Sequence, residues 1–179
     1  PAGPLRFDLS AAESEQTTQA EKAAKEGVTV TAENESAGEE TAMMLNLTAT
    51  ETTGEGILGY QFELLYDAAV IEPQAASCDV SETISRGMTA ICHASESGVL
   101  KVVVFGTTPM SGTGTLLKLN FNVVGARGST SPLSIKNFMF NEDSPQQVTT
   151  DGQVLVGDSR TETISIGRHL FTAVGQSTR

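Results

Sequence analysis

The chain has 179 residues, of which 39% are hydrophobic and 18% are charged, a balance typical of a folded globular protein. Its 22 acidic and 11 basic residues give a formal net charge of −11, which argues against binding to nucleic acid or to anionic lipid, because both need clusters of Lys and Arg. No apolar run approaches the roughly 18 residues that a membrane-spanning helix requires, so no membrane insertion is expected.

Residues 1–27 differ in composition from the rest of the chain and are predicted to form an N-terminal extension. Three apolar residues near its start alternate with polar ones, as they do in a β-strand: Leu5, Phe7 and Leu9. A short helical leader is predicted to follow, because Ser10 and Glu13 have the spacing of a capping box and Gly27 can end a helix. Alanine is the only apolar residue type in that stretch, so this helix is expected to bury little surface.

From residue 28 onward apolar residues recur at every second position, which is the period of a strand with one buried face. Eight segments show the pattern: 28–32, 41–50, 57–66, 88–94, 99–106, 115–125, 132–140 and 152–157. Gly, Pro, Ser and Asp separate them, and no convincing helix interrupts them. Residues 28–157 are therefore predicted to form an all-β, antiparallel sandwich of about nine strands.

The strand predicted at 57–66 ends abruptly at the sequence "DAAVIEP", residues 67–73. Four apolar residues before this point are expected to face the core: Leu58, Tyr60, Phe62 and Leu64. Asp67 is expected to cap backbone amides in a turn, as Asp commonly does. Val70 and Ile71 are then expected to pack inward where the chain crosses between two layers.

Residues 158–179 are predicted to form a C-terminal extension containing one extra strand. Its apolar residues are Ile164, Ile166, Leu170, Phe171 and Val174. An apolar segment of this kind can pair with an open sheet edge of a neighbouring molecule, and head-to-tail pairing would build a filament. The N-terminal residues Leu5, Phe7 and Leu9 are a second candidate for such donation. The alternative is that residues 160–179 are a linker toward another domain of a longer protein, folded back onto this domain.

The two cysteines, Cys78 and Cys92, are 14 positions apart. They either form a disulfide, which would indicate an oxidising, extracellular compartment, or remain two reduced and buried thiols. The chain starts at Pro1 without a signal-peptide pattern, which predicts a processed mature chain or an excised fragment. Glycosylation sequons begin at Asn34 and Asn46.

Catalytic and metal-binding patterns are sparse. His93 follows Cys92 directly, and adjacent residues of a strand point to opposite faces, so these two cannot form a catalytic pair. No enzymatic activity and no organic cofactor are therefore expected. Three loop carboxylates are candidate ligands for Ca²⁺, which prefers oxygen ligands: Asp143, Asp151 and Asp158.

The stretch "GILGYQFELLYDAAVIEP", residues 56–73, resembles the signature of cohesin domains. The later segments "GVLKVVVFG", "GTGTLLKLNFNVVG", "SPLSIKNFMF" and "VTTDGQVLV" are similar to the later strands of that family, in the same order. The resemblance covers about residues 28–156 and implies a nine-stranded jelly-roll sandwich related to some carbohydrate-binding modules. Cohesins are non-catalytic receptors that hold dockerin modules of extracellular enzymes through one sheet face.

Together these patterns predict a non-enzymatic, extracellular or cell-surface module for protein–protein interaction. The leading hypothesis is an assembly role, as a structural surface or filament subunit whose identical subunits join through terminal β-strands. The alternative is a cohesin-type receptor that binds a dockerin or a glycan through one sheet face. Aromatic residues make up 5% of the chain and Trp is absent, which weakens the glycan hypothesis.

Overall fold

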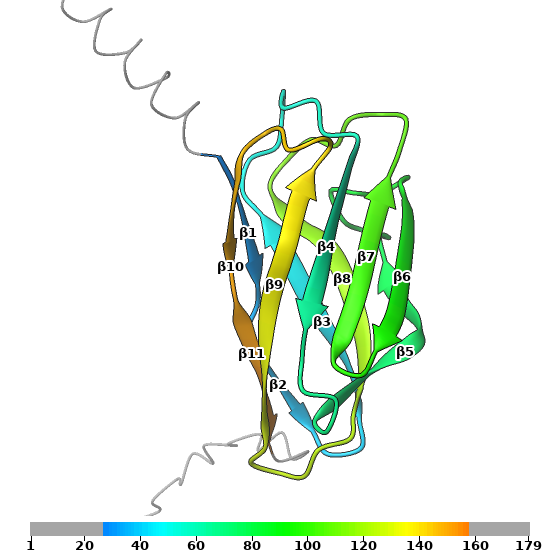
Figure 1. Cartoon of the computed structure of the whole chain (residues 1–179), viewed down its shortest axis with the longest axis vertical. Helices are drawn as coiled ribbons and strands as arrows, with labels where there is room; N and C mark the ends of the chain where they lie inside the picture. Colours follow the sequence, from blue (N-terminus) through cyan, green and yellow to red (C-terminus); the bar gives the residue numbers. More distant parts are fainter. Residues whose placement is uncertain (1–26, 158–179) are drawn as a thin grey trace, which may run out of the picture.

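Eleven β-strands form two sheets that pack face to face (Figure 1). The computed structural model describes residues 27–157. One sheet has five strands in the order β10-β1-β3-β8-β5, and the other has six in the order β2-β11-β9-β4-β7-β6. The strands are β1 (Val28–Ala32), β2 (Glu35–Gly38), β3 (Ala42–Ala49), β4 (Gly59–Leu65), β5 (Ile71–Asp79), β6 (Thr89–Glu96), β7 (Val99–Phe105), β8 (Gly114–Val123), β9 (Thr130–Phe140), β10 (Gln147–Thr150) and β11 (Gly152–Gly157).

The core lies between the sheets, and most of its residues are the alternate ones that the two-residue period predicted. In β8, Leu117, Leu119, Phe121 and Val123 are buried, while the intervening Lys118, Asn120 and Asn122 are more exposed. The same alternation holds in β3, β4 and β7. Tyr60 is buried with its polar atom satisfied, since its hydroxyl lies 3.0 Å from Ser85 Oγ and donates to the Leu116 carbonyl at 3.2 Å. The predicted all-β sandwich is confirmed.

The strand count and the strand directions differ from the prediction. The structure adds three strands to the eight predicted segments: β2 and β10, of four residues each, and β5, whose first three residues were predicted to belong to a turn. Neither β2 nor β10 buries a side chain, so no apolar period marks them. Both lie at sheet edges, where β10 pairs with β1 and β2 pairs with β11, each in parallel. The sheets are thus mixed, and the prediction of a purely antiparallel sandwich was wrong in this respect.

One side of the sandwich is closed by two chain segments that pass from one sheet to the other. The chain leaves β1 in the five-stranded sheet and enters β2 in the six-stranded one, and β10 and β11 make the same passage beside it. Gly152 lies at this crossing, where a side-chain Cβ would overlap the carbonyl oxygen of Ala32 and lie 2.7 Å from that of Glu33. Glycine at this position therefore allows the two backbones to approach.

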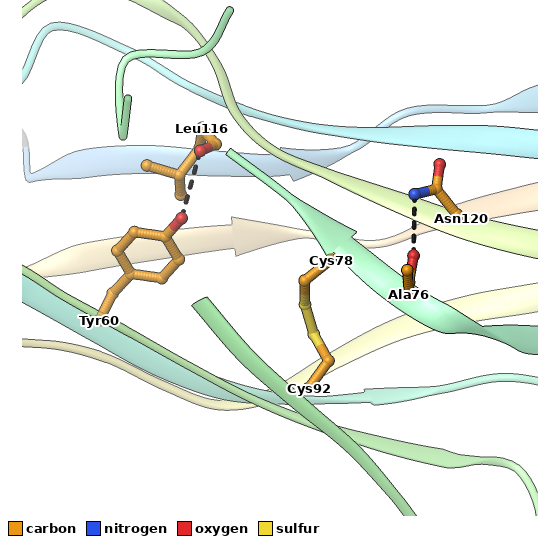
Figure 2. Close-up of a disulfide and its surroundings, with 6 residues drawn as sticks. All are labelled: Tyr60, Ala76, Cys78, Cys92, Leu116 and Asn120. Carbon is orange, nitrogen blue, oxygen red and sulfur yellow. Dashed lines mark hydrogen bonds between the residues drawn. A yellow bond between two sulfur atoms is a disulfide. The ribbon is translucent and has the colours of Figure 1, made fainter. Parts of the chain in front are cut away.

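The opposite side of the sandwich is closed by a disulfide. Cys78 on β5 is bonded to Cys92 on β6, with their Cα atoms 6.0 Å apart (Figure 2). Backbone pairing of β5 with β8 is interrupted between Pro73 and Cys78. In that interval Asn120 Nδ2 donates to the Ala76 carbonyl at 3.0 Å. Of the two alternatives left open by the sequence, the structure contains the disulfide.

The abrupt end of β4 has the predicted local structure, with one correction at its start. Asp67 Oδ1 accepts a hydrogen bond from the Ala69 amide at 2.9 Å, and Val70 and Ile71 are buried. Leu58, however, is 43% exposed, and the neighbouring Ile57 is fully buried in its place. Gly56 precedes them with a positive φ of 66°. The expected alternation therefore begins only at Tyr60.

Residues 1–26 and 158–179 lie outside the described part of the chain. The predicted helical leader, the extra C-terminal strand and all candidate donated residues fall there, and these remain predictions. Within residues 27–157, no helical segment has the length and hydropathy required to cross a bilayer.

Candidate protein-binding face

The outer surface of the six-stranded sheet carries three apolar side chains that lie next to one another. Ile91 on β6 is directly opposite Val103 on β7, and Phe105 is two residues further along β7. Their exposed fractions are 54%, 42% and 49%. We refer to Ile91, Val103 and Phe105 as the apolar patch. A strand with one wet face normally places polar residues there, so these three exposed side chains need an explanation.

The local sequence explains why the apolar patch is exposed. Residues 102–105 are apolar at every position, "VVVF", and a strand can turn only alternate residues inward. Val102 and Val104 occupy the core, which leaves Val103 and Phe105 outside. Phe105 is opposite Thr89 on β6 and Gly59 on β4, so on the β4 side the directly opposite residue has no side chain to cover its ring. The apolar patch is thus exposed to solvent on both β6 and β7.

A cluster of charged and amide groups borders the apolar patch along the same face. Glu63 on β4 is opposite Lys101 on β7 and Lys136 on β9, and its Oε1 lies 3.6 Å from Lys101 Nζ. Both side chains of that ion pair are partly exposed, so it contributes little to stability, on the order of 0–1 kcal/mol. Its position beside exposed apolar residues suits recognition better than stabilisation.

Asn137 joins this cluster through an irregularity in β9. Pairing between β4 and β9 shifts register between Gln61 and Glu63, and Asn137 adopts a positive φ of 51° there. Its Nδ2 donates to Glu63 Oε2 at 3.0 Å. A non-glycine residue in the left-handed region costs free energy, and such residues are concentrated at functional sites. A hollow of about 310 Å³ lies between Asn137, Glu63, Lys101, Gln61 and Val103.

The charge of this face differs from that of the whole molecule. Residues 27–157 contain 15 acidic residues against five Lys and Arg. On this face Lys101, Lys136 and His93 are all exposed, and His93 is directly opposite Lys101. The sheet face therefore combines an apolar patch with a near balance of charge, Lys101 and Lys136 against Glu63 and Glu96, whereas residues 27–157 as a whole are strongly acidic.

The other predicted site residues do not gather at one place. Asn34 is exposed and its Oδ1 accepts a hydrogen bond from the Gln153 amide at 2.9 Å, whereas Asn46 is half-buried in β3. These sequons lie on different parts of the fold, and their glycosylation remains a prediction.

The calcium candidates gain no support from the described geometry. The Asp151 carboxylate accepts hydrogen bonds from Ser134 Oγ at 2.6 Å and the Ile135 amide at 2.8 Å, and the Ser134 bond lowers its pKa. Asp143 lies in the turn after β9, and Asp158 is outside the described residues. Within residues 27–157, no three or more His, Cys, Asp or Glu side chains are grouped so that they could hold a metal ion.

Comparison with known proteins decides the family. The model of the cohesin domain matches residues 27–156 of the chain. The chain belongs to the cohesin family. No curated protein matches it.

Solved cohesins share this fold at low sequence identity. The sixth cohesin of scaffoldin B from Acetivibrio cellulolyticus, solved in complex with a mutant Cel5 dockerin, is 22% identical with a TM-score of 0.60, covering 73% of this chain and 99% of that one. A non-cellulosomal cohesin from the archaeon Archaeoglobus fulgidus is 15% identical with a TM-score of 0.61, covering 73% and 91%. At these identities the likeness establishes the fold of this cohesin.

Proposed function

We propose that this cohesin is a non-enzymatic receptor module that binds a protein partner of the dockerin type through the outer face of its six-stranded sheet. The single observation that carries the proposal is the apolar patch, three neighbouring apolar side chains that are each 42–54% exposed. Clustered exposed apolar residues with a polar border are typical of protein-binding sites. Several similar cohesins have been solved in complex with a dockerin, which supports a dockerin as the class of partner.

The opposite face of the sandwich is a weaker candidate. On β3 the exposed Met44 is opposite Asn120 of β8, and the neighbouring positions of β8, Lys118 and Asn122, are polar. Gln74 Nε2 donates to Asn122 Oδ1 at 3.1 Å, so amide groups on this face already bond one another. An isolated exposed apolar residue among polar ones needs no partner.

A protein partner fits this face better than a glycan does. Flat sugar-binding faces rely on exposed aromatic rings, against which sugar rings stack. Among residues 27–157, Phe105 is the one exposed aromatic residue, and the remaining six Phe and Tyr side chains are buried. A single ring gives no extended platform. The disulfide supports an extracellular or cell-surface location, because such bonds persist in oxidising compartments.

The proposal is tested with the full-length chain and a panel of purified dockerin modules. Biolayer interferometry should detect saturable binding to at least one dockerin, with a dissociation constant that rises with ionic strength, because charged groups border the apolar patch. Absence of binding across a panel that recognises several other cohesins would reject the dockerin class.

Assembly through terminal strands is a second candidate. The observation in its favour is β6, an eight-residue edge strand that is hydrogen-bonded within residues 27–157 only to β7. An edge of this length can accept an added strand. The expected result is a full-length protein larger than one chain by light scattering and a single chain after deletion of residues 160–179. A full-length protein that stays monomeric at high concentration would exclude it.

A further inference from the structure

Two adjoining hollows form a groove at the end of the sandwich where β4 turns into β5. The first, of about 780 Å³, lies between the β4–β5 turn, the turn at Ser97–Gly98 and the start of β9. The second, of about 480 Å³, lies between the start of β5 and the end of β6. Both are lined by Tyr66, Ala68 and Ser97, so they lie on either side of the same corner. We call them together the end groove.

The end groove has apolar walls and an acidic border. Small or apolar side chains line it, among them Leu65, Ala68, Ala69, Pro73, Ala94 and Pro132. Its charged lining residues are Asp67, Glu72 and Glu96, and no Lys, Arg or His lines either hollow. Glu72 lies close enough to Tyr66 to help burial raise the pKa of that phenol. An occupant should therefore combine apolar side chains with positive charge.

The C-terminal segment of the same chain has this composition. Residues 158–179 contain three arginines and one histidine against two acidic residues, in a protein whose net charge is −11. Arg168 and His169 stand directly between two apolar pairs, Ile164 with Ile166 and Leu170 with Phe171. The segment is thus opposite in charge to the border of the end groove and carries apolar side chains for its walls.

The segment also starts close enough to reach the end groove. The last described strand, β11, ends at Gly157, and Gln153 of that strand is paired with Pro132 in the groove wall. The four residues from Gln153 to Gly157 span about 13 Å of strand, which is the distance to be covered along the sheet. The seven residues from Gly157 to Ile164 can span about 23 Å when extended, which is more than enough. The β8–β9 loop connects the two places, because the Gly128 amide donates to the Val156 carbonyl and the Val124 amide to the Val70 carbonyl.

We propose that the end groove binds residues 164–174 of the same molecule, with Leu170 and Phe171 against its apolar walls and Arg168 facing its carboxylates. This inference does not rest on the receptor function, since the end groove is separate from the apolar patch. In this arrangement the C-terminal segment binds its own molecule, and the same residues are then not available to pair with a neighbouring molecule.

Photo-crosslinking of the full-length protein tests the inference. The change is Phe171→p-benzoylphenylalanine, followed by irradiation and mass spectrometry of tryptic peptides. The expected result is a product of monomer mass in which residue 171 is joined to residues 65–73, 94–98 or 132–134. Adding Arg168→Glu should lower the yield at least about fivefold, because it places a carboxylate against Asp67, Glu72 and Glu96. Arg179→Glu, beyond the apolar run, is the matched control and should leave the yield unchanged.

Each other outcome contradicts the inference in an identifiable way. A crosslinked product of dimer mass would place the segment on a second copy and favour assembly. Crosslinks to other surfaces, or a yield no higher than that of the same probe at Ser177, would show that the end groove is not its binding site. Equal yields with Arg168→Glu and Arg179→Glu would show that Arg168 does not face the carboxylates of the end groove.

Discussion

Replacing Val103 with aspartate is expected to weaken binding of a dockerin selected from the panel at least about 100-fold. Val103 lies at the centre of the apolar patch, between Ile91 on β6 and Phe105 on β7. Truncating a central residue of an interface commonly costs about 2 kcal/mol or more, and the new carboxylate would also be buried against apolar groups without a partner. A loss of about 2.8 kcal/mol corresponds to 100-fold in the dissociation constant.

The fold itself should tolerate this change. Val103 is 42% exposed, so the free energy of unfolding should fall by no more than about 1 kcal/mol, the range of strand propensities. Met44→Asp is the matched control, because Met44 is 46% exposed on the other sheet. Interferometry and urea denaturation are run on both variants. If V103D binds as the wild type does, or if M44D loses as much affinity, the face has been assigned wrongly.

Breaking the Cys78–Cys92 disulfide is expected to lower the free energy of unfolding by about 3 kcal/mol, the value for a closed loop of about 15 residues. The physical reason is the weak attachment of β5. Its backbone pairing with β8 is interrupted between Pro73 and Cys78, and side chains of Gln74 and Asn120 bridge the gap. Without the covalent bond, no backbone pairing within residues 27–157 joins β5 to β6 on that side of the sandwich.

Urea denaturation of the wild type with and without dithiothreitol measures this effect. The double variant Cys78→Ser, Cys92→Ser is expected to match the reduced wild type, and dithiothreitol should leave its midpoint unchanged. Binding through the apolar patch should persist at low denaturant, because Cys92 is paired with Val102 on the inward side of the sheet. Coincident curves for oxidised and reduced wild type would show that the strand pairs alone hold β5 in place.

Much of the fold could be predicted because its central strands have one buried face. In β8 the two-residue period placed Leu117, Leu119, Phe121 and Val123 correctly but missed the adjacent Leu116, which is also buried, and the bounds of β1 and β11 agree with the prediction. The polar edge strands β2 and β10 could not be found this way, since they bury no side chain and pair with segments over 100 residues away. At Ile57 and Leu58 two adjacent apolar residues competed for one buried position, which periodicity does not resolve.

The candidate site was less predictable than the fold. The run "VVVF" at residues 102–105 was a usable signal, because four consecutive apolar residues cannot all face one core. The position of Asn137 could not be predicted. Lys136 and Asn137 are both polar and exposed, and nothing in the sequence marks the register shift beside them. Glu63 belongs to the site because it contacts Lys101 and Asn137, and these lie 38 and 74 positions away in the sequence.

Oxidative footprinting of the full-length protein, with and without a bound dockerin, tests the assignment of the binding face most directly. Hydroxyl radicals modify exposed Met and Phe side chains, and the most exposed of these on the two faces are Met44 on β3 and Phe105 on β7. The account predicts that the dockerin lowers the modification rate of Phe105 several-fold and leaves that of Met44 unchanged. Protection of Met44 with Phe105 still reactive would contradict it.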